Sequence, residues 1–267
     1  MNQKQRLDYL IDTLMQENPE DGAWLQRQYG NTFALLRALL NIRPPQPCSD
    51  EFLAVQDAFL QEMTREKGIV DVAGLKPIAS HPQLYLWQGD ITRLNADAIV
   101  NAANSKLLGC WQPNHNCIDN IIHTMSGVQL RRDCVALMET QGYDEPAGQA
   151  KITPAYNLPG RYVLHTVGPI VHGKLTEEHC RLLQASYQNC LELAAVHGLK
   201  SVAFCCISTG VFGFPQEPAA RIAVRTALEF LQQDTSVQQI IFNVFKDEDK
   251  LIYQNVLGAL PVVDKEF

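Results

Sequence analysis

Residues 98–104 read Ala-Ile-Val-Asn-Ala-Ala-Asn, an apolar run that ends in two alanines flanked by Asn101 and Asn104. We interpret this run as a strand that stops where the amides begin. In an open α/β sheet, ligands bind beyond the carboxyl ends of the strands. The two amides are therefore placed to hydrogen-bond a neutral, polyhydroxylated group such as a sugar. The alternative is that both asparagines only close turns, which is a common use of this residue.

From residue 84 onward, short β-rich runs alternate with longer helical patterns. This alternation is typical of an α/β fold, in which helices cover the faces of a sheet. The expected strands are 84–88, 97–101, 149–153, 161–167, 200–206 and 238–244. The expected helices are 117–139, 176–197, 215–233 and 247–258.

The first 80 residues have helical periodicity. The expected helices there are 3–16, 23–41 and the segment between Ser49 and Gly68. A linker is expected over 68–82. We therefore divide the chain into a helical N-terminal extension over 1–80 and an α/β domain over 81–267, and we expect the extension to cover the sheet domain.

Composition and charge restrict the ligand and the compartment. Of the 267 residues, 46% are hydrophobic and 19% charged, and no apolar run reaches the length of about 18 residues that a membrane helix needs. The N-terminus lacks the apolar core of a secretory signal, so we expect a cytoplasmic protein whose eight cysteines stay reduced. The formal net charge of −7 argues against broad nucleic-acid binding, which needs clustered lysines and arginines. An anionic ligand would have to be held locally.

A loop of mostly small residues follows the expected strand 200–206. Residues 208–213 read Ser-Thr-Gly-Val-Phe-Gly, and a helix is expected from Pro215. Such a loop can point several backbone N–H groups at a phosphate, with the helix dipole assisting and without a lysine. Phe212 has little core to fill there and is placed to cover a ribose. The alternative is a plain strand-to-helix connection.

Cysteine and histidine cluster just after Asn104. Cys110, His115 and Cys117 lie within eight residues, and two thiolates with one imidazole can bind a single Zn²⁺ while leaving the open position of a catalytic site. Mixed sulfur and nitrogen ligands suit zinc better than iron. Two alternatives stay open: a chance grouping of buried cysteines with a surface histidine, and a structural zinc site with His123 as fourth ligand. We expect His123 to pack against the sheet instead.

Asp119 follows this cluster by two residues, at the start of an expected helix. A carboxylate at that position can simply stabilise the helix N-terminus. Beside a metal, it can also orient a water or a ribose hydroxyl as a general base.

Together these elements resemble the macrodomain family, and in particular its zinc-containing microbial branch of ADP-ribosylhydrolases. The resemblance covers about residues 84–260, with Gly-Asp-Ile-Thr at 89–92, Asn-Ala-Ala-Asn-Ser at 101–105 and the 208–213 loop as its motifs. Where the family has a glycine-rich stretch before an aspartate, this chain has an insertion that carries the metal cluster. The resemblance implies a three-layer α/β/α fold with a mixed central sheet, preceded by a helical extension.

The resemblance also implies roles for individual residues. Asp90 would hold the adenine amino group, and Ile91 would donate a backbone N–H beside it. Asn101 and Asn104 would contact the distal ribose, and Asn104 and Asp119 would take part in catalysis. The diphosphate would lie on Ser208, Thr209, Gly210, Val211, Phe212 and Gly213. The ligands of Zn²⁺ would be Cys110, His115 and Cys117.

The activity implied by the resemblance is zinc-dependent hydrolysis of mono-ADP-ribose from protein side chains, with a carboxylate ester as the expected linkage. The partner would be an ADP-ribosylated protein, and some members of the branch work beside a sirtuin-type ADP-ribosyltransferase and a lipoyl-carrier protein. Two other functions stay open: an O-acetyl-ADP-ribose deacetylase and a reader that binds ADP-ribose without cleaving it.

Overall fold

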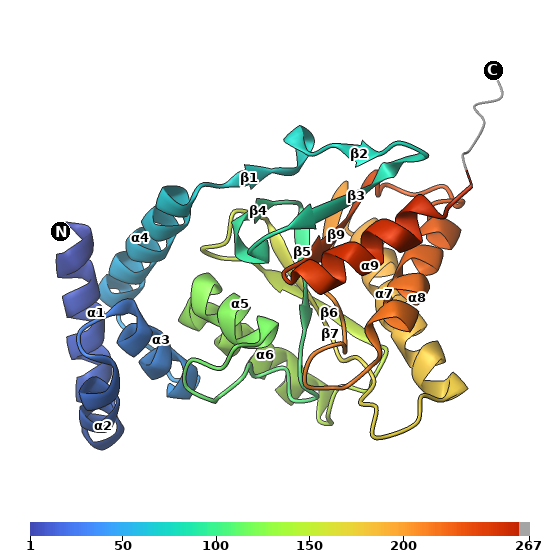
Figure 1. Ribbon diagram of the computed structural model, residues 1–267. Helices are drawn as coiled ribbons and strands as arrows, with labels where there is room; N and C mark the ends of the chain where they lie inside the picture. Colours follow the sequence, from blue (N-terminus) through green and yellow to red (C-terminus); the bar gives the residue numbers. More distant parts are fainter. Residues whose placement is uncertain (262–267) are drawn as a thin grey trace.

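The computed structural model describes residues 1–261, and the last six residues of the expected domain 81–267 lie outside the described residues. The expected α/β class is confirmed, because a mixed sheet lies between two layers of helices (Figure 1). The strands are β1 (Val70–Asp71), β2 (Pro77–Ile78), β3 (His81–Gln88), β4 (Leu94–Asn95), β5 (Ala98–Ala102), β6 (Ala150–Pro154), β7 (Tyr162–Thr166), β8 (Ser201–Phe204) and β9 (Gln239–Val244). The helices are α1 (Gln3–Glu17), α2 (Pro19–Tyr29), α3 (Phe33–Ile42), α4 (Asp50–Lys67), α5 (Ile118–Ser126), α6 (Val128–Gln141), α7 (Glu177–Val196), α8 (Gln216–Phe230) and α9 (Asp247–Gly258), with 3₁₀ turns η1 (Val72–Gly74) and η2 (Ile91–Arg93).

The main sheet has the strand order β2-β3-β9-β8-β5-β7-β6. The five central strands, which are β3, β9, β8, β5 and β7, run parallel to one another. The outermost strands, β2 and β6, are antiparallel to their neighbours. Parallel strands require crossover connections, and the helices supply them. As a consequence, the carboxyl ends of the five parallel strands all lie on the same side of the sheet, across the strand direction. This side is called the carboxyl edge of the sheet.

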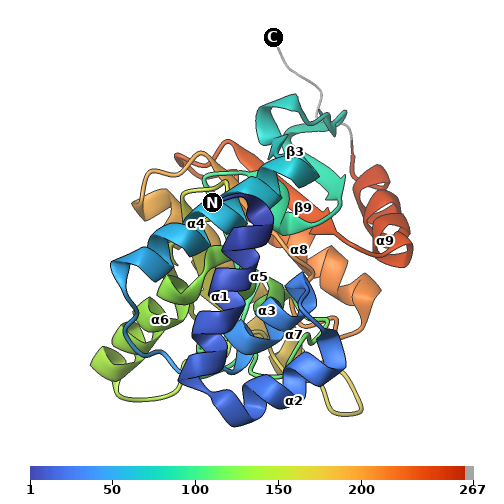
Figure 2. The same cartoon turned by 90° about the vertical axis from the view of Figure 1, so that its left-hand side faces the viewer.

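The helices form layers on both sides of this sheet. Helices α5 and α6 cover one face and α7, α8 and α9 cover the other, while α1 to α4 lie outside α5 and α6 (Figure 1). A view turned by 90° looks onto this outer layer, with α1 in front of α5 and α6 (Figure 2). Among residues 1–261, the structure contains no helix with the length and apolar character needed to cross a membrane.

Two expected helices are each broken by a glycine. The expected helix 23–41 is wrong, because α2 ends at Gly30, whose φ of 59° is left-handed, and α3 starts anew at Phe33. The expected helix 117–139 is likewise divided into α5 and α6 at Gly127, with φ of 97°. Helical periodicity continues across both breaks, so periodicity alone could not reveal them.

The expected linker over 68–82 is wrong in part. This segment contributes β1, which pairs with β4, and β2, which pairs with β3. Two-residue strands are too short to show an alternating pattern, and the partner of β1 lies beyond β3 in the chain.

A polar contact holds the outer helical layer against the sheet domain at Gly127. The side-chain amide of Gln56, in α4, donates to Gln129 Oε1 at 2.8 Å, and its oxygen accepts from Val128 N at 3.0 Å. A Cβ at Gly127 would lie 2.6 Å from Gln56 Nε2 and 2.8 Å from Gln129 Oε1. Both the left-handed backbone and this close packing therefore require glycine.

We predict that Gly127→Ala lowers the free energy of unfolding by about 2–4 kcal/mol, because it adds backbone strain to overpacking. Urea unfolding measures the change. Gly258→Ala is the matched control, since no described atom lies within 4 Å of its added Cβ, and we expect it to cost nothing. Equal stability of Gly127→Ala and the wild type would contradict the close packing of α4 against Gly127.

Candidate active site

Two of the expected site residues converge on the carboxylate of a third, Asp119. Asn101, at the end of β5, donates from Nδ2 to Asp119 Oδ1 at 2.8 Å, and Asn104 donates from Nδ2 to Asp119 Oδ2 at 3.2 Å. Asn104 also donates to Gly109 O at 2.9 Å. The side chain of Asn101 is wholly buried, whereas Asn104 is half-exposed. The two amides thus fix both oxygens of Asp119, and Asn104 is the amide that faces the surface.

The Asp119 carboxylate is almost inaccessible, with 5% of the residue exposed. Burial raises the pKa of Asp119 to about 6, although the hydrogen bond from Asn101 and the charge of Arg131 act in the opposite direction. A carboxylate that titrates close to neutral pH can either accept or hold a proton there. This behaviour is suited to a general acid or base.

The expected metal ligands lie together. The ligand atoms of Cys110, His115 and Cys117 are all within 4.8 Å of one another, with Cys110 Sγ 3.6 Å from His115 Nδ1. Between them, Asn114 adopts a left-handed φ of 52° and reverses the chain, a conformation that asparagine tolerates. Burial raises the pKa of the Cys117 thiol to about 12, so metal binding would have to displace its proton. Two sulfurs and one imidazole nitrogen in this arrangement fit a tetrahedral divalent metal with one open position.

In a second group, His123, Cys134 and His165 are also close enough for a metal, but the ring of His165 is occupied by hydrogen bonds. His165 Nδ1 accepts from Asn101 at 3.3 Å, and His165 Nε2 lies 2.9 Å from Thr153 Oγ1. Burial lowers the pKa of His165 to about 4, so its ring is neutral. With both nitrogens engaged, His165 supports Asn101 and has no lone pair left for a metal.

His123 packs in the interior, as expected, with 5% exposure. Its Nε2 lies 3.5 Å from Asp119 Oδ1, and neither ring nitrogen has a hydrogen-bond partner among the described residues. It belongs to the second group and not to the group of Cys110. A structural site with His123 as a fourth ligand is therefore not formed in this arrangement.

The 208–213 loop presents free backbone donors at the same edge of the sheet. It closes through Phe214 N to Ser208 O at 3.0 Å and Gly213 N to Gly210 O at 3.1 Å. Within the described chain, the N–H groups of Gly210, Val211 and Phe212 donate to no protein acceptor. Unpaired N–H groups immediately before a helix form a cradle for an anion.

Gly168 supports this loop and was not among the expected site residues. A Cβ at Gly168 would lie 2.0 Å from Ser208 Oγ and 2.7 Å from Ile207 Cγ2. Ser208 itself has a left-handed φ of 65°. The only signal in the sequence is a glycine between the expected strand 161–167 and Pro169.

Asp90 lies beyond the carboxyl end of β3. Its Oδ1 accepts from Thr92 N at 3.0 Å and from Thr92 Oγ1 at 2.6 Å, which orients the carboxylate, and the residue is half-exposed. Ile91 is buried beside it. Phe245, which follows the neighbouring strand β9, is 71% exposed at this edge. Phe245 was not among the expected site residues, because an aromatic after a strand gives no specific signal.

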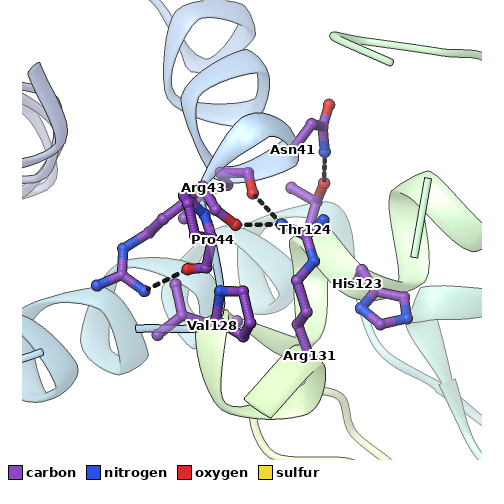
Figure 3. A pocket seen from close by; sticks show the side chains of 10 residues that line it. Asn41, Arg43, Pro44, His123, Thr124, Val128 and Arg131 are labelled. Atoms are coloured by element: carbon purple, nitrogen blue, oxygen red, sulfur yellow. Dashed lines mark hydrogen bonds between the residues drawn. The ribbon is translucent and has the colours of Figure 1, made fainter. Parts of the chain in front are cut away.

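A small cavity lies between the outer helices and the α5–α6 pair (Figure 3). Its volume of about 20 Å³ has room for about one water molecule. The lining residues include Asn41, Pro44, His123, Thr124 and Arg131. The cavity is too small for a nucleotide, so the candidate site is the sheet edge and not this cavity.

Comparison with known proteins points to one family. The Macro domain family model matches residues 100–223. A protein-ADP-ribose hydrolase of Treponema medium is 53% identical over 261 residues, covering 97% of this chain and 100% of that protein. The protein-ADP-ribose hydrolase of a Staphylococcus aureus strain is 49% identical over 260 residues, covering 96% of each.

Solved structures agree with the sequence relatives. A Trypanosoma brucei macrodomain in complex with ADP-ribose is 30% identical, with a TM-score of 0.65, covering 83% of this chain and 95% of that one. An Oceanobacillus iheyensis macrodomain with ADP is 38% identical, with a TM-score of 0.60, covering 68% of this chain and 92% of that one.

We predict that the chain binds one divalent metal ion and that Cys110→Ser removes it, because a neutral hydroxyl is a far poorer ligand than a thiolate. Elemental analysis of dialysed protein measures the number of metal ions per chain. Cys180→Ser, which changes a half-buried cysteine of α7, should retain the metal. Two equivalents in the wild type would show that the His165 group binds metal after all.

Proposed function

This chain belongs to the macrodomain family, and we propose that it hydrolyses ADP-ribose from modified proteins with the help of Zn²⁺. Relatives at about half identity over nearly their whole length carry the name protein-ADP-ribose hydrolase. The observation that carries the proposal is the juxtaposition at one sheet edge. A buried carboxylate held by two amides follows a metal-binding group by two residues.

We propose that the ligand lies along the carboxyl edge of the sheet. Asp90 would accept from the adenine amino group, with the Ile91 N–H beside it and Phe245 free to stack on the base. The loop of Ser208, Thr209, Gly210, Val211, Phe212 and Gly213 would cradle the diphosphate through its free N–H groups. Asn104, the more exposed of the two amides, would reach the distal ribose. Asn101 is buried, so any contact with the ribose would require it to turn from Asp119.

The bond broken is the link between C1″ of the distal ribose and a protein carboxylate, and water supplies the hydroxyl and the proton of the products. Asp119 would take a proton from the attacking water and return it to a leaving group. The amides of Asn101 and Asn104 would hold its oxygens in place during this exchange. When bound by Cys110, His115 and Cys117, Zn²⁺ would supply a mild Lewis acid, since two thiolates offset its charge.

Other parts of the proposal follow from the same resemblance. We propose residues 81–267 as the catalytic domain, 1–80 as its extension, and the cytoplasm as the compartment. A sirtuin-type ADP-ribosyltransferase and a lipoyl-carrier protein are proposed partners.

The direct test is release of ADP-ribose from a protein modified on a single carboxylate. We predict that Asp119→Ala lowers the turnover rate by about 10²–10⁴, the usual contribution of a general acid or base, and leaves zinc content and ADP-ribose affinity nearly unchanged. A chelator should also stop release without unfolding the domain. Mass spectrometry measures the release of ADP-ribose, and calorimetry measures the affinity for ADP-ribose.

Asp234→Ala is the control, because Asp234 is an exposed carboxylate in the loop before β9, at the opposite edge of the sheet. Wild-type turnover by Asp119→Ala would remove Asp119 from the mechanism. Activity on O-acetyl-ADP-ribose but not on the modified protein would favour the deacetylase, and binding without any cleavage would favour the reader.

We predict that Gly168→Ala weakens ADP-ribose binding about tenfold or more, because its Cβ displaces Ser208 and overpacking costs about 1–3 kcal/mol. Calorimetric titration measures the Kd. Gly74→Ala is the control, since its Cβ meets no described atom within 4 Å. An unchanged Kd in folded Gly168→Ala would argue against the 208–213 loop as the diphosphate site.

A further inference from the structure

The metal loop, residues 110–117, has little internal structure to fix its shape. The turn from His115 N to Gln112 O, at 3.2 Å, is its main-chain hydrogen bond within the described residues. A ligand set is useful only if its atoms are held close to the geometry that the metal requires. The loop must therefore be held from outside.

Helix α3 of the N-terminal extension supplies part of that support through Arg37. Its guanidinium donates from Nη2 to His115 O at 2.9 Å and from Nε to Asn120 Oδ1 at 2.8 Å. Asn120 in turn donates from Nδ2 to Gln112 O at 2.9 Å. Arg37 thus bridges a metal ligand's own backbone and the first turn of α5, where Asp119 lies.

The same face of α3 also holds the reversal at Asn114. The backbone N of Asn114 donates to Asn41 Oδ1 at 2.9 Å, and its side chain donates to Ala34 O at 3.0 Å. Ala34, Arg37 and Asn41 are spaced by three and four residues, so they share one helix face. Asn41 further donates to Thr124 Oγ1 at 3.1 Å, visible in Figure 3. One face of α3 therefore contacts the metal loop and α5 together.

Charge favours the same arrangement. The Arg37 guanidinium lies near the sulfurs of Cys117 and Cys110. A guanidinium stays charged at neutral pH and stabilises thiolate ligands in its neighbourhood. Arg37 accordingly donates two hydrogen bonds to the site and places a positive charge beside it.

We propose that Arg37 and Asn41 are positioning residues of the metal site, so that the N-terminal extension forms part of the catalytic unit and does more than cover it. The inference rests on the proposed zinc-dependent function. Outer groups that orient metal ligands typically contribute a factor of about 10–100 in metal affinity. Without them, the ligands remain in the chain but lose their common geometry.

The test measures zinc affinity by competition with a chromophoric chelator, in the full-length chain. Arg37→Met retains the apolar part of the long side chain but removes its two hydrogen bonds and its charge. Asn41→Ala removes the oxygen that accepts a hydrogen bond from Asn114 N. Each should weaken zinc binding about 10-fold or more and change the visible spectrum of the Co²⁺-substituted protein. The kcat for ADP-ribose release should fall while the Kd for ADP-ribose stays constant, which also shows that the sheet domain is folded.

Arg6→Met is the matched control. Arg6 is a half-buried arginine of α1 that donates to Gln3 within the same helix, so its loss should leave the zinc affinity and the Co²⁺ spectrum unchanged. Wild-type zinc affinity and an unshifted spectrum in both Arg37→Met and Asn41→Ala would overturn the inference. An equal loss of zinc affinity in Arg6→Met would also overturn it, because general loosening of the extension would then explain the effect. Absence of zinc from the wild type would instead overturn the proposed function.

Discussion

Asp119 is a buried carboxylate that no charged cation among residues 1–261 contacts directly, and this is the constraint on which the site depends. Removing a charge from water is costly unless hydrogen bonds replace the lost solvation. For Asp119, the replacements come from Asn101 and Asn104, one amide for each oxygen. Asn101 is oriented in turn by His165, and His165 by Thr153 on β6. A chain of polar contacts thus runs across neighbouring strands to hold one buried carboxylate.

Arg131 joins this interior to both the outer helices and the metal loop. It donates from Nη1 to Leu40 O at 3.1 Å and to Arg43 O at 2.6 Å, and from Nε to Leu108 O at 2.8 Å. Its guanidinium also lies 4.4 Å from the ring centre of Trp111. Such contacts satisfy carbonyls at the end of α3 that would otherwise be unpaired at a buried helix terminus. The extension is therefore bound to the sheet domain by specific polar contacts as well as by apolar packing.

Sequence patterns identified the sheet and the groups that follow its strands in the chain. Roles for Asn104 and the 208–213 loop were inferred because each follows an expected strand, and parallel strands bring their carboxyl ends to one edge. A role for Asp90 was inferred from the family resemblance of residues 89–92. The breaks at Gly30 and Gly127 were missed because periodicity continues across them. Gly168, Arg37 and the support of Asn101 by His165 depend on contacts between distant segments, and no local pattern encodes such contacts.

Helix α5 is the element through which these contacts meet. Asp119 and His123 face the sheet, whereas Asn120 and Thr124 face α3. Asn120 and Thr124 are one turn apart, and Thr124 Oγ1 donates to Asn120 O at 2.8 Å, so the two contacts with α3 are joined along the helix. A shift of α3 would consequently move the metal loop and the carboxylate together, because both are attached to the same short helix. The position of the proposed catalytic carboxylate is in this sense a property of the whole chain, whereas the edge proposed for the nucleotide is defined by the parallel strands.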